Sequence, residues 1–241
     1  LAESHSGIYF QMYIQGETGM RILVTGGCGF IGSNFIRFML EKYPDVTIVN
    51  LDKLTYAGNP ENLRDKECDP RYRFVLGDIC NPSAARAAME GCDAVLNFAA
   101  ESHVDRSIAD ANDFVMTGVM GVRVLLDTAR SLKIGRFVQI GTDEVYGSIK
   151  GAAVSEDAPL SPSSPYSAAK AAGDLLALAY FKTHGLPVVV TRSSNNYGPW
   201  QHPEKFIPLF ITRGIEGKTL PLYGDGRNIR DWIHVLDNCR A

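Results

Sequence analysis

Short runs of hydrophobic residues recur along the chain, and most of them end in glycine or polar residues. Five runs have the length and character of buried strands, at residues 21–25, 46–51, 72–76, 94–98 and 137–140. Helical patterns lie between and after them, at 30–42, from about 82, at 113–132 and at 166–184. In 113–132 the apolar residues recur at three- and four-residue spacing, which is typical of a helix covering a sheet. Strands alternating with helices through short links predict an α/β fold with a doubly wound parallel sheet.

The first strand opens into a glycine-rich turn. Gly26, Gly29 and Gly32 recur at three-residue intervals, and Gly27, Gly29 and Gly32 form the pattern G-x-G-x-x-G. Glycines let the backbone turn sharply and let a pyrophosphate approach the amides at the start of the helix at 30–42, where the helix dipole favours negative charge. The turn therefore predicts a dinucleotide site of the Rossmann type, although any tight strand-to-helix turn can use glycine.

Acidic residues end the second and third strands. Asp52 lies twenty positions after Gly32, where a carboxylate accepts hydrogen bonds from an adenosine ribose and repels a 2′-phosphate. This spacing favours NAD over NADP. Asp78 and Ile79 follow the third strand and are expected beside the adenine; for Asp78, a cap of the helix that starts near residue 82 is an almost equal alternative.

Composition narrows the class of protein. The chain has 241 residues and a net charge of −3, which gives no reason to expect a nucleic acid or a membrane surface as partner. Its five cysteines are odd in number and widely spaced, so we expect neither a disulfide framework nor a metal site, and a reducing cytoplasm fits best. No run reaches the roughly 18 apolar residues of a membrane helix. Residues 1–19 match no helix or strand pattern and are interpreted as a leader or a cloning remnant.

A tyrosine and a lysine share one face of the helix at 166–184. Tyr166 and Lys170 are four residues apart, and a lysine ammonium near the phenol would lower the pKa of the tyrosine toward the range of a general base. The spacing alone is common on helices. Together with the glycine turn and the polar strand end at 141–147, it identifies the chain as a member of the extended short-chain dehydrogenase/reductase family.

Several stretches resemble one group within that family, the dTDP-glucose 4,6-dehydratases. The discriminating element is Thr142-Asp143-Glu144, since a dehydration needs a second acid/base pair that the related epimerases and reductases do not. The alternative for Asp143 and Glu144 is a structural role, as an exposed acidic pair that caps a turn. The stretches that carry the resemblance are 25–33, 50–59, 97–107, 142–147, 194–199, 203–205 and 223–226.

The resemblance implies a reaction that converts dTDP-glucose to dTDP-4-keto-6-deoxyglucose. Tyr166 would take the C4 hydroxyl proton while hydride passes to NAD, with Lys170 and Thr142 orienting the reacting groups. Glu144 would then remove the C5 proton, and a protonated Asp143 would expel the C6 hydroxyl as water before hydride returns to C6.

The resemblance also implies two sets of contacts. The cofactor contacts, together with the glycine turn, are Gly26, Gly29, Phe30, Ile31, Gly32, Asp52, Lys53, Leu54, Thr55, Asp78, Ile79, Phe98, Ala99, Ala100, Ser102, Thr117, Tyr166, Lys170 and Asn196. The substrate contacts are Ser102, Thr142, Asn195, Glu204, Lys205, Pro221, Leu222, Tyr223 and Arg230. Lys205 and Arg230 suit a diphosphate, which a guanidinium binds well, but either residue can equally be a solvated surface charge.

The chain departs from the family pattern at a few positions. Cys28 stands in the glycine turn where alanine is usual, and a small buried residue is its expected role. Residues 20–192 are expected to form the NAD-binding domain and 193–241 the start of a smaller substrate-binding region that is only partly present. Relatives dimerise through two long helices, for which 113–132 and 166–184 are the candidates.

Three functions remain open on the sequence. The first is the dehydratase. The second is another NAD-dependent sugar-nucleotide epimerase, decarboxylase or reductase of the same fold, and the third is a catalytically silent NAD-binding protein.

Overall fold

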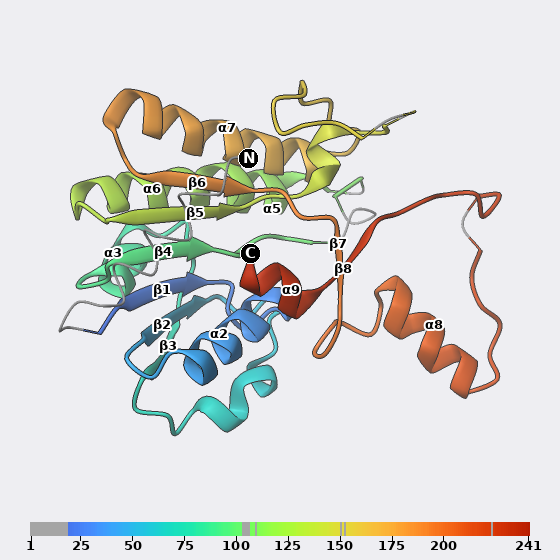
Figure 1. The fold of residues 1–241 in the computed structure, drawn as a ribbon, viewed down its shortest axis with the longest axis horizontal. Coiled ribbons are helices and arrows are strands. Elements are labelled where there is room, and N and C mark those ends of the chain that lie inside the picture. The colour runs from blue at the N-terminus through green and yellow to red at the C-terminus, as the bar shows by residue number, and fades with distance from the viewer. Residues whose placement is uncertain (1–18, 103–106, 109, 150, 152, 223) are drawn as a thin grey trace, which may run out of the picture.

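A six-stranded parallel sheet forms the centre of the molecule (Figure 1). The computed structural model describes residues 19–102, 107–108, 110–149, 151, 153–222 and 224–241. The strand order is β3-β2-β1-β4-β5-β6, with the change of direction between β1 and β4 that places a crevice at the carboxyl ends of the strands. The strands are β1 (Arg21–Thr25), β2 (Thr47–Asp52), β3 (Tyr72–Leu76), β4 (Ala94–Asn97), β5 (Arg136–Ile140) and β6 (Val188–Thr191).

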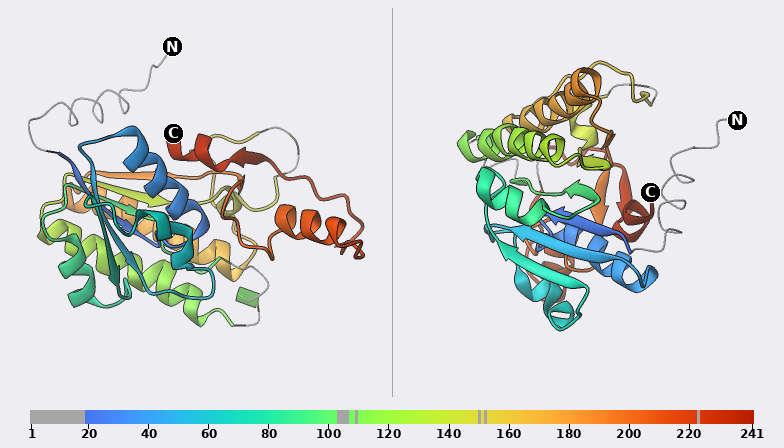
Figure 2. Two further views of the ribbon diagram at one scale, coloured as in Figure 1. Left: turned by 90° about the horizontal axis from the view of Figure 1, so that it is seen from below. Right: turned by 90° about the vertical axis from the view of Figure 1, so that its left-hand side faces the viewer.

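Helices cover both faces of this sheet, so the doubly wound fold expected from the sequence is confirmed (Figure 2). Neighbouring side chains of a strand point to opposite faces. Leu23 of β1 therefore packs in one hydrophobic cluster, whereas Ile22 and Val24 pack in the other. The helical elements along this part of the chain are α2 (Phe30–Lys42), the 3₁₀ helix η1 (Pro60–Lys66), α3 (Pro82–Met89), α5 (Asn112–Val115), the π-helical segment η2 (Met116–Gly121), α6 (Val122–Ser131), the 3₁₀ turn η3 (Asp143–Tyr146) and α7 (Pro165–His184).

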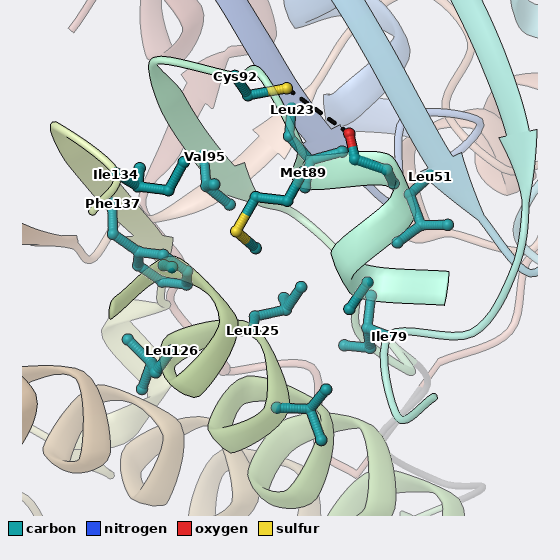
Figure 3. Packing of buried hydrophobic residues seen from close by; sticks show 14 of the residues in the cluster. Leu23, Leu51, Ile79, Met89, Cys92, Val95, Leu125, Leu126, Ile134 and Phe137 are labelled. Atoms are coloured by element: carbon teal, nitrogen blue, oxygen red, sulfur yellow. Dashed lines mark hydrogen bonds between the residues drawn. The ribbon is translucent and has the colours of Figure 1, made fainter. Parts of the chain in front are cut away.

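The larger cluster joins the sheet to α3, α6 and α7 (Figure 3). Phe137, Leu125 and Met89 are fully buried within it. The second cluster joins the other face of the sheet to α2, through Phe35, Ile36 and neighbouring residues. These two cores hold the sheet rigidly, which positions the loops at its carboxyl edge.

The boundaries of the helices follow from local chemistry. Ser164 and Ser167 form a capping box at the start of α7, and Gly185 ends the helix with a left-handed φ of 67°. Asn81 caps α3 by accepting hydrogen bonds from the amides of Ser83 and Ala84. The alternative that Asp78 caps this helix is therefore wrong, because the Asp78 carboxylate accepts the amide of Cys80 and the Asn81 side chain lies closer to the helix start.

The helix expected at 113–132 is interrupted by a wider turn. Met116–Gly121 forms the π-helical segment η2 between α5 and α6. In this segment the small residues Thr117, Gly118 and Gly121 are buried, whereas Met116 and Met120 are exposed, so the hydrophobic pattern alone did not indicate the change of helix type.

The chain after β6 forms a smaller unit at one side of the sheet. β7 (Asn195–Tyr197) and β8 (Trp232–His234) pair in parallel, α9 (Val235–Arg240) packs against α2, and α8 (Phe206–Ile215) extends away from the sheet (Figure 1). The described helices include none that is long and apolar enough to cross a membrane. Residues 1–18, which make up most of the expected leader, lie outside the described part of the chain.

Candidate active site

A cavity of about 760 Å³ lies at the carboxyl ends of the parallel strands. The turn after β1, the ends of β2 and β3 and the segments after β4 and β5 all line it, and Tyr166 and Lys170 of α7 complete one wall. The cavity thus brings together all five expected catalytic residues with every expected cofactor contact except Leu54.

The glycine turn leaves room for a close approach of backbone and ligand. Gly26 has a φ of +69°, and a Cβ there would lie 2.6 Å from the amide nitrogen of Ala99. A Cβ on Gly32 would lie 2.5 Å from the carbonyl oxygen of Gly26. Helix α2 begins after Gly29 without a side-chain cap and has no acidic residue in its first turn. Its first amides are therefore available to phosphate oxygens, so the turn fits the pyrophosphate of a dinucleotide.

Asp52 is held at the end of β2 by two backbone amides. Its Oδ2 accepts the amide of Cys28 at 2.9 Å, and its Oδ1 accepts the amide of Leu54 at 2.8 Å. Leu54 reaches this position with a left-handed φ of 55°. Burial raises the pKa of Asp52, and the two amides and the Lys53 charge oppose that rise. The carboxylate is thus fixed in orientation at the end of β2, where the sequence predicts a ribose contact.

Lys53 bridges three neighbouring segments beside Asp52. Its Nζ lies 3.4 Å from a carboxylate oxygen of Glu101, 3.8 Å from one of Asp78 and 3.4 Å from the hydroxyl of Thr117. This network forms the cavity wall between β3, β4 and η2. Cys28 is buried in the turn, and burial raises the pKa of its thiol to about 12, which makes it a packing residue.

The acidic pair of η3 faces the cavity. Thr142 caps this short turn: its hydroxyl accepts the amide of Glu144 and donates to Asp143 Oδ1, each at 3.3 Å. Burial raises the pKa of both Asp143 and Glu144, and the Asp143 charge raises that of Glu144 further. The alternative of an exposed acidic pair is wrong, since both side chains are half-buried against the cavity.

Tyr166 and Lys170 lie one turn apart on α7 and both line the cavity. Burial raises the pKa of Tyr166, the Glu144 and Asp143 charges add to the rise, and a hydrogen bond with Thr142 opposes it. Burial lowers the pKa of Lys170, whose ammonium donates to the carbonyl of Ile140. The lowered tyrosine pKa expected from the sequence is therefore wrong for this structure, because desolvation dominates and the ammonium is directed to the backbone.

The expected substrate contacts are only partly brought together. Ser102, Thr142, Asn195, Glu204 and Lys205 line the cavity, and Lys205 Nζ donates to the carbonyl of Ser102 at 2.8 Å.

Three other expected substrate contacts lie outside the lining. Leu222 is 75% exposed, Pro221 precedes it, and Arg230 donates to the carbonyl of Ile229 at 2.8 Å. The Arg230 charge still lowers the pKa of Glu144. Tyr223 lies outside the described residues.

Comparison with known proteins matches this arrangement. A profile of the GDP-mannose 4,6 dehydratase family matches residues 23–241. The dTDP-glucose 4,6-dehydratase of Actinoplanes sp. is 54% identical over 227 residues, which cover 92% of this chain and 71% of that protein. The low-salt glycan biosynthesis protein Agl12 of Haloferax volcanii is 54% identical over 222 residues, with the same two coverages. DesIV of Streptomyces venezuelae, a dTDP-glucose 4,6-dehydratase solved with NAD and TYD bound, has a TM-score of 0.89 and 55% identity, covering 92% of this chain and 70% of that one.

The chain belongs to the dTDP-glucose 4,6-dehydratase family. This assignment agrees with the extended short-chain dehydrogenase/reductase fold. It also agrees with the Thr142-Asp143-Glu144 element, which distinguished the dehydratases in the sequence.

Among the residues that line the cavity but were not predicted as contacts, one group comes from the segment after β7. Trp200, Gln201 and His202 line it because the segment after β7 folds back over α2. Asn34 Nδ2 donates to the carbonyl of Pro199 at 2.9 Å, and the Arg37 guanidinium lies 4.8 Å from the Trp200 ring centre. These contacts join residues more than 160 positions apart. Neither periodicity nor turn chemistry carries a signal for them.

Proposed function

We propose that the protein is an NAD-dependent dTDP-glucose 4,6-dehydratase that forms dTDP-4-keto-6-deoxyglucose and water. The observation that carries the proposal is a single cavity with two kinds of chemistry. Tyr166 and Lys170 of α7 lie in it beside the Thr142-Asp143-Glu144 turn, and the glycine turn opens into the same space.

The residues at the carboxyl edge of the sheet would hold NAD, which when bound would supply the hydride acceptor and donor of the reaction. The amides at the start of α2 and the carboxylate of Asp52 would bind its pyrophosphate and adenosine ribose, for which the uncapped helix start and the two amides on Asp52 are the supporting observations. Lys53, Asp78 and Thr117 would enclose the adenosine side.

Tyr166 would take the proton of the C4 hydroxyl as hydride leaves. Its hydrogen bond with Thr142 favours the phenolate. Burial disfavours the phenolate, so its formation would depend on the Thr142 hydroxyl and on the Lys170 charge in the occupied site.

Glu144 and Asp143 would carry out the elimination. A ketone at C4 acidifies the C5 proton, which Glu144 would remove, and Asp143 would protonate the leaving C6 hydroxyl. Burial supports both roles, because a raised pKa makes Glu144 a stronger base and favours the protonated form of Asp143.

The dehydratase explains the site better than the other two functions do. An epimerase or reductase needs only the redox pair, and a silent NAD-binding protein needs neither pair. Asp143 and Glu144 would then be two half-buried carboxyl groups without a task, although burial disfavours their charge.

Lys205 and Arg230 would neutralise the diphosphate of the nucleotide sugar. Both charges act on Glu144 and lower its pKa, so both lie near the elimination site. The name of DesIV, with NAD and TYD bound, supports a thymidine nucleotide as the substrate class.

Assembly and location are part of the same proposal. We infer a homodimer formed through α7 and the helices at 112–131, because Leu175, Val115, Met116 and Met120 are apolar side chains exposed on these helices. All five cysteines are free thiols, which fits a reducing cytoplasm.

Two variants test the reaction. Replacing Asp143 by Asn together with Glu144 by Gln should leave the first hydride transfer but slow water loss by about 10²–10⁴-fold, the usual contribution of general acid–base groups. Reduced NAD should then accumulate during a single turnover, which its absorbance measures. Tyr166→Phe should instead suppress the first hydride transfer itself, so that no reduced NAD appears. Equal loss of both steps in the double variant would make the acidic pair structural. An unchanged first step in Tyr166→Phe would overturn the role of the tyrosine.

A further inference from the structure

A buried ion pair lies behind the two catalytic groups. Asp174 is fully buried on α7, one turn after Lys170, and its Oδ2 accepts Arg192 Nε at 2.9 Å. Arg192 follows β6 and is itself largely buried. None of the steps derived above uses either residue.

Arg192 connects this pair to the acid–base turn. Its Nη1 donates to the hydroxyl of Tyr146 at 2.7 Å, and its guanidinium lies 5.2 Å from the centre of the Tyr146 ring. Tyr146 is the last residue of η3, the turn that carries Asp143 and Glu144. The Tyr146 hydroxyl also donates to the carbonyl of Glu156 at 3.3 Å, so its position is held from two sides.

Asp174 also lies against the backbone that leads into this turn. A Cβ on Gly141 would lie 3.0 Å from each carboxylate oxygen of Asp174 and 2.5 Å from the carbonyl oxygen of Thr191. Gly141 directly precedes Thr142, and Lys170 bonds to the carbonyl of Ile140 just before it. One face of α7 therefore contacts the backbone at residues 140–141, at the end of β5, through Lys170 and Asp174. Arg192 contacts Tyr146 at the other end of η3.

We propose that Asp174 and Arg192 are positioning residues that keep the Asp143–Glu144 turn in register with the Tyr166–Lys170 pair of α7. This inference rests on the proposed function. A buried ion pair is weak as a source of stability, because hydrophobic residues of similar volume often serve as well. Its place between three elements that each carry or adjoin the proposed catalytic groups indicates an orienting role, since small errors of orientation cost large factors in rate.

Tyr146→Phe is the most direct test, because it removes the hydrogen bond from Arg192 to η3, keeps the aromatic ring and leaves the buried ion pair intact. Removing Arg192 itself would strand a buried carboxylate and endanger folding. Arg192→Lys is the second variant: it keeps the charge beside Asp174 but loses the fork that also reaches Tyr146. Arg71→Gln is the matched control, because it breaks the Arg71–Asp69 ion pair outside the cavity.

Two readouts separate positioning from simple stabilisation. In single turnovers of the holoprotein with dTDP-glucose, Tyr146→Phe and Arg192→Lys should slow water loss about tenfold or more, with the first hydride transfer within twofold of the parent. Amide hydrogen exchange at 143–147 should be at least tenfold faster in both variants and unchanged in the glycine turn at 26–32. The control should move neither readout.

The outcomes are distinct. If a folded Tyr146→Phe protein slows both chemical steps equally, or slows neither, the positioning role is overturned. Unchanged amide exchange at 143–147 would overturn it as well. If the parent protein forms no ketone product, the proposed function fails, and the exchange measurement alone then decides whether Arg192 holds the turn.

Discussion

At the scale of single residues, burial determines the ionisation of the acid–base pair. Desolvation is the largest cause of the raised pKa of Glu144, followed by the neighbouring Asp143 charge, whereas Arg230 and Lys205 oppose both effects. A carboxyl whose pKa is higher in the folded than in the unfolded chain binds its proton more tightly when folded. The contribution of this carboxyl to the free energy of unfolding is therefore fully present below its ordinary pKa and is lost as pH rises through the pKa in the folded chain.

Glu144→Gln should consequently stabilise the protein while slowing water loss by up to about 10²–10⁴-fold. Near pH 4, around the unperturbed pKa of glutamate, the variant and the parent should melt at similar temperatures. At pH 7.5 the variant should melt higher by roughly 2–4 °C, the response of a domain of this size to about 1 kcal/mol. Calorimetry of the ligand-free proteins at both pH values measures this difference, with the exposed Glu90→Gln as control. A variant that is less stable than the parent at pH 7.5 would contradict the assigned cost of ionisation.

At the scale of elements, the π-helical segment η2 places small residues against the cofactor wall. Gly121 lies where a Cβ would be 2.5 Å from Ile79 Cδ1, and Gly118 where a Cβ would be 3.1 Å from the Cβ of Ala169. Ile79 is buried in the larger core and also lines the cavity. The segment thus couples packing of the core to the shape of the expected adenine site.

Gly121→Ala should therefore both destabilise the fold and weaken NAD binding. Overpacking of this kind costs about 1–3 kcal/mol, and displacement of Ile79 would reach the cavity. The matched control is Gly214→Ala on α8, where a Cβ would meet no atom within 4 Å. Because alanine favours the helix more than glycine does, this variant should raise the free energy of unfolding by up to about 1 kcal/mol. Denaturant unfolding and calorimetric titration with NAD measure the two effects. Similar behaviour of the two variants would show that Gly121 has room for a side chain.

At the scale of the whole molecule, two faces of the same helices differ in their surroundings. The inner face of α7 carries Tyr166, Lys170 and Asp174, whereas Leu175 on the same helix is 56% exposed. Apolar exposure also occurs at Val115, Met116 and Met120 on the neighbouring helical segments. In the proposed homodimer a second copy of the chain would bury these side chains, none of which lines the cavity.

Leu175→Glu together with Met120→Glu should then convert a dimer into a monomer, because each buried charge without a partner is costly. Light scattering after size-exclusion chromatography measures the mass. Ile211→Glu, on the exposed α8, is the control and should leave the mass unchanged. A parent protein with monomer mass would refute the dimer directly.

The sequence by itself determined the local features of this protein. Alternating runs predicted five of the six parallel strands, and the glycine spacing with Asp52 predicted the turn that opens the cavity, because strand length, helix period and backbone freedom are properties of neighbouring residues. β6 was not predicted, since four residues at a sheet edge carry little pattern.

Only the tertiary structure decided how distant groups act on one another. Burial raised the pKa of Tyr166 where the sequence suggested a lowered one, and the Asp174–Arg192–Tyr146 connection joins residues up to 46 positions apart. The loop with Trp200 reached the cavity through contacts with α2. Desolvation and charge coupling depend on what surrounds a group in space, and the order of residues along the chain does not contain that information in any local pattern.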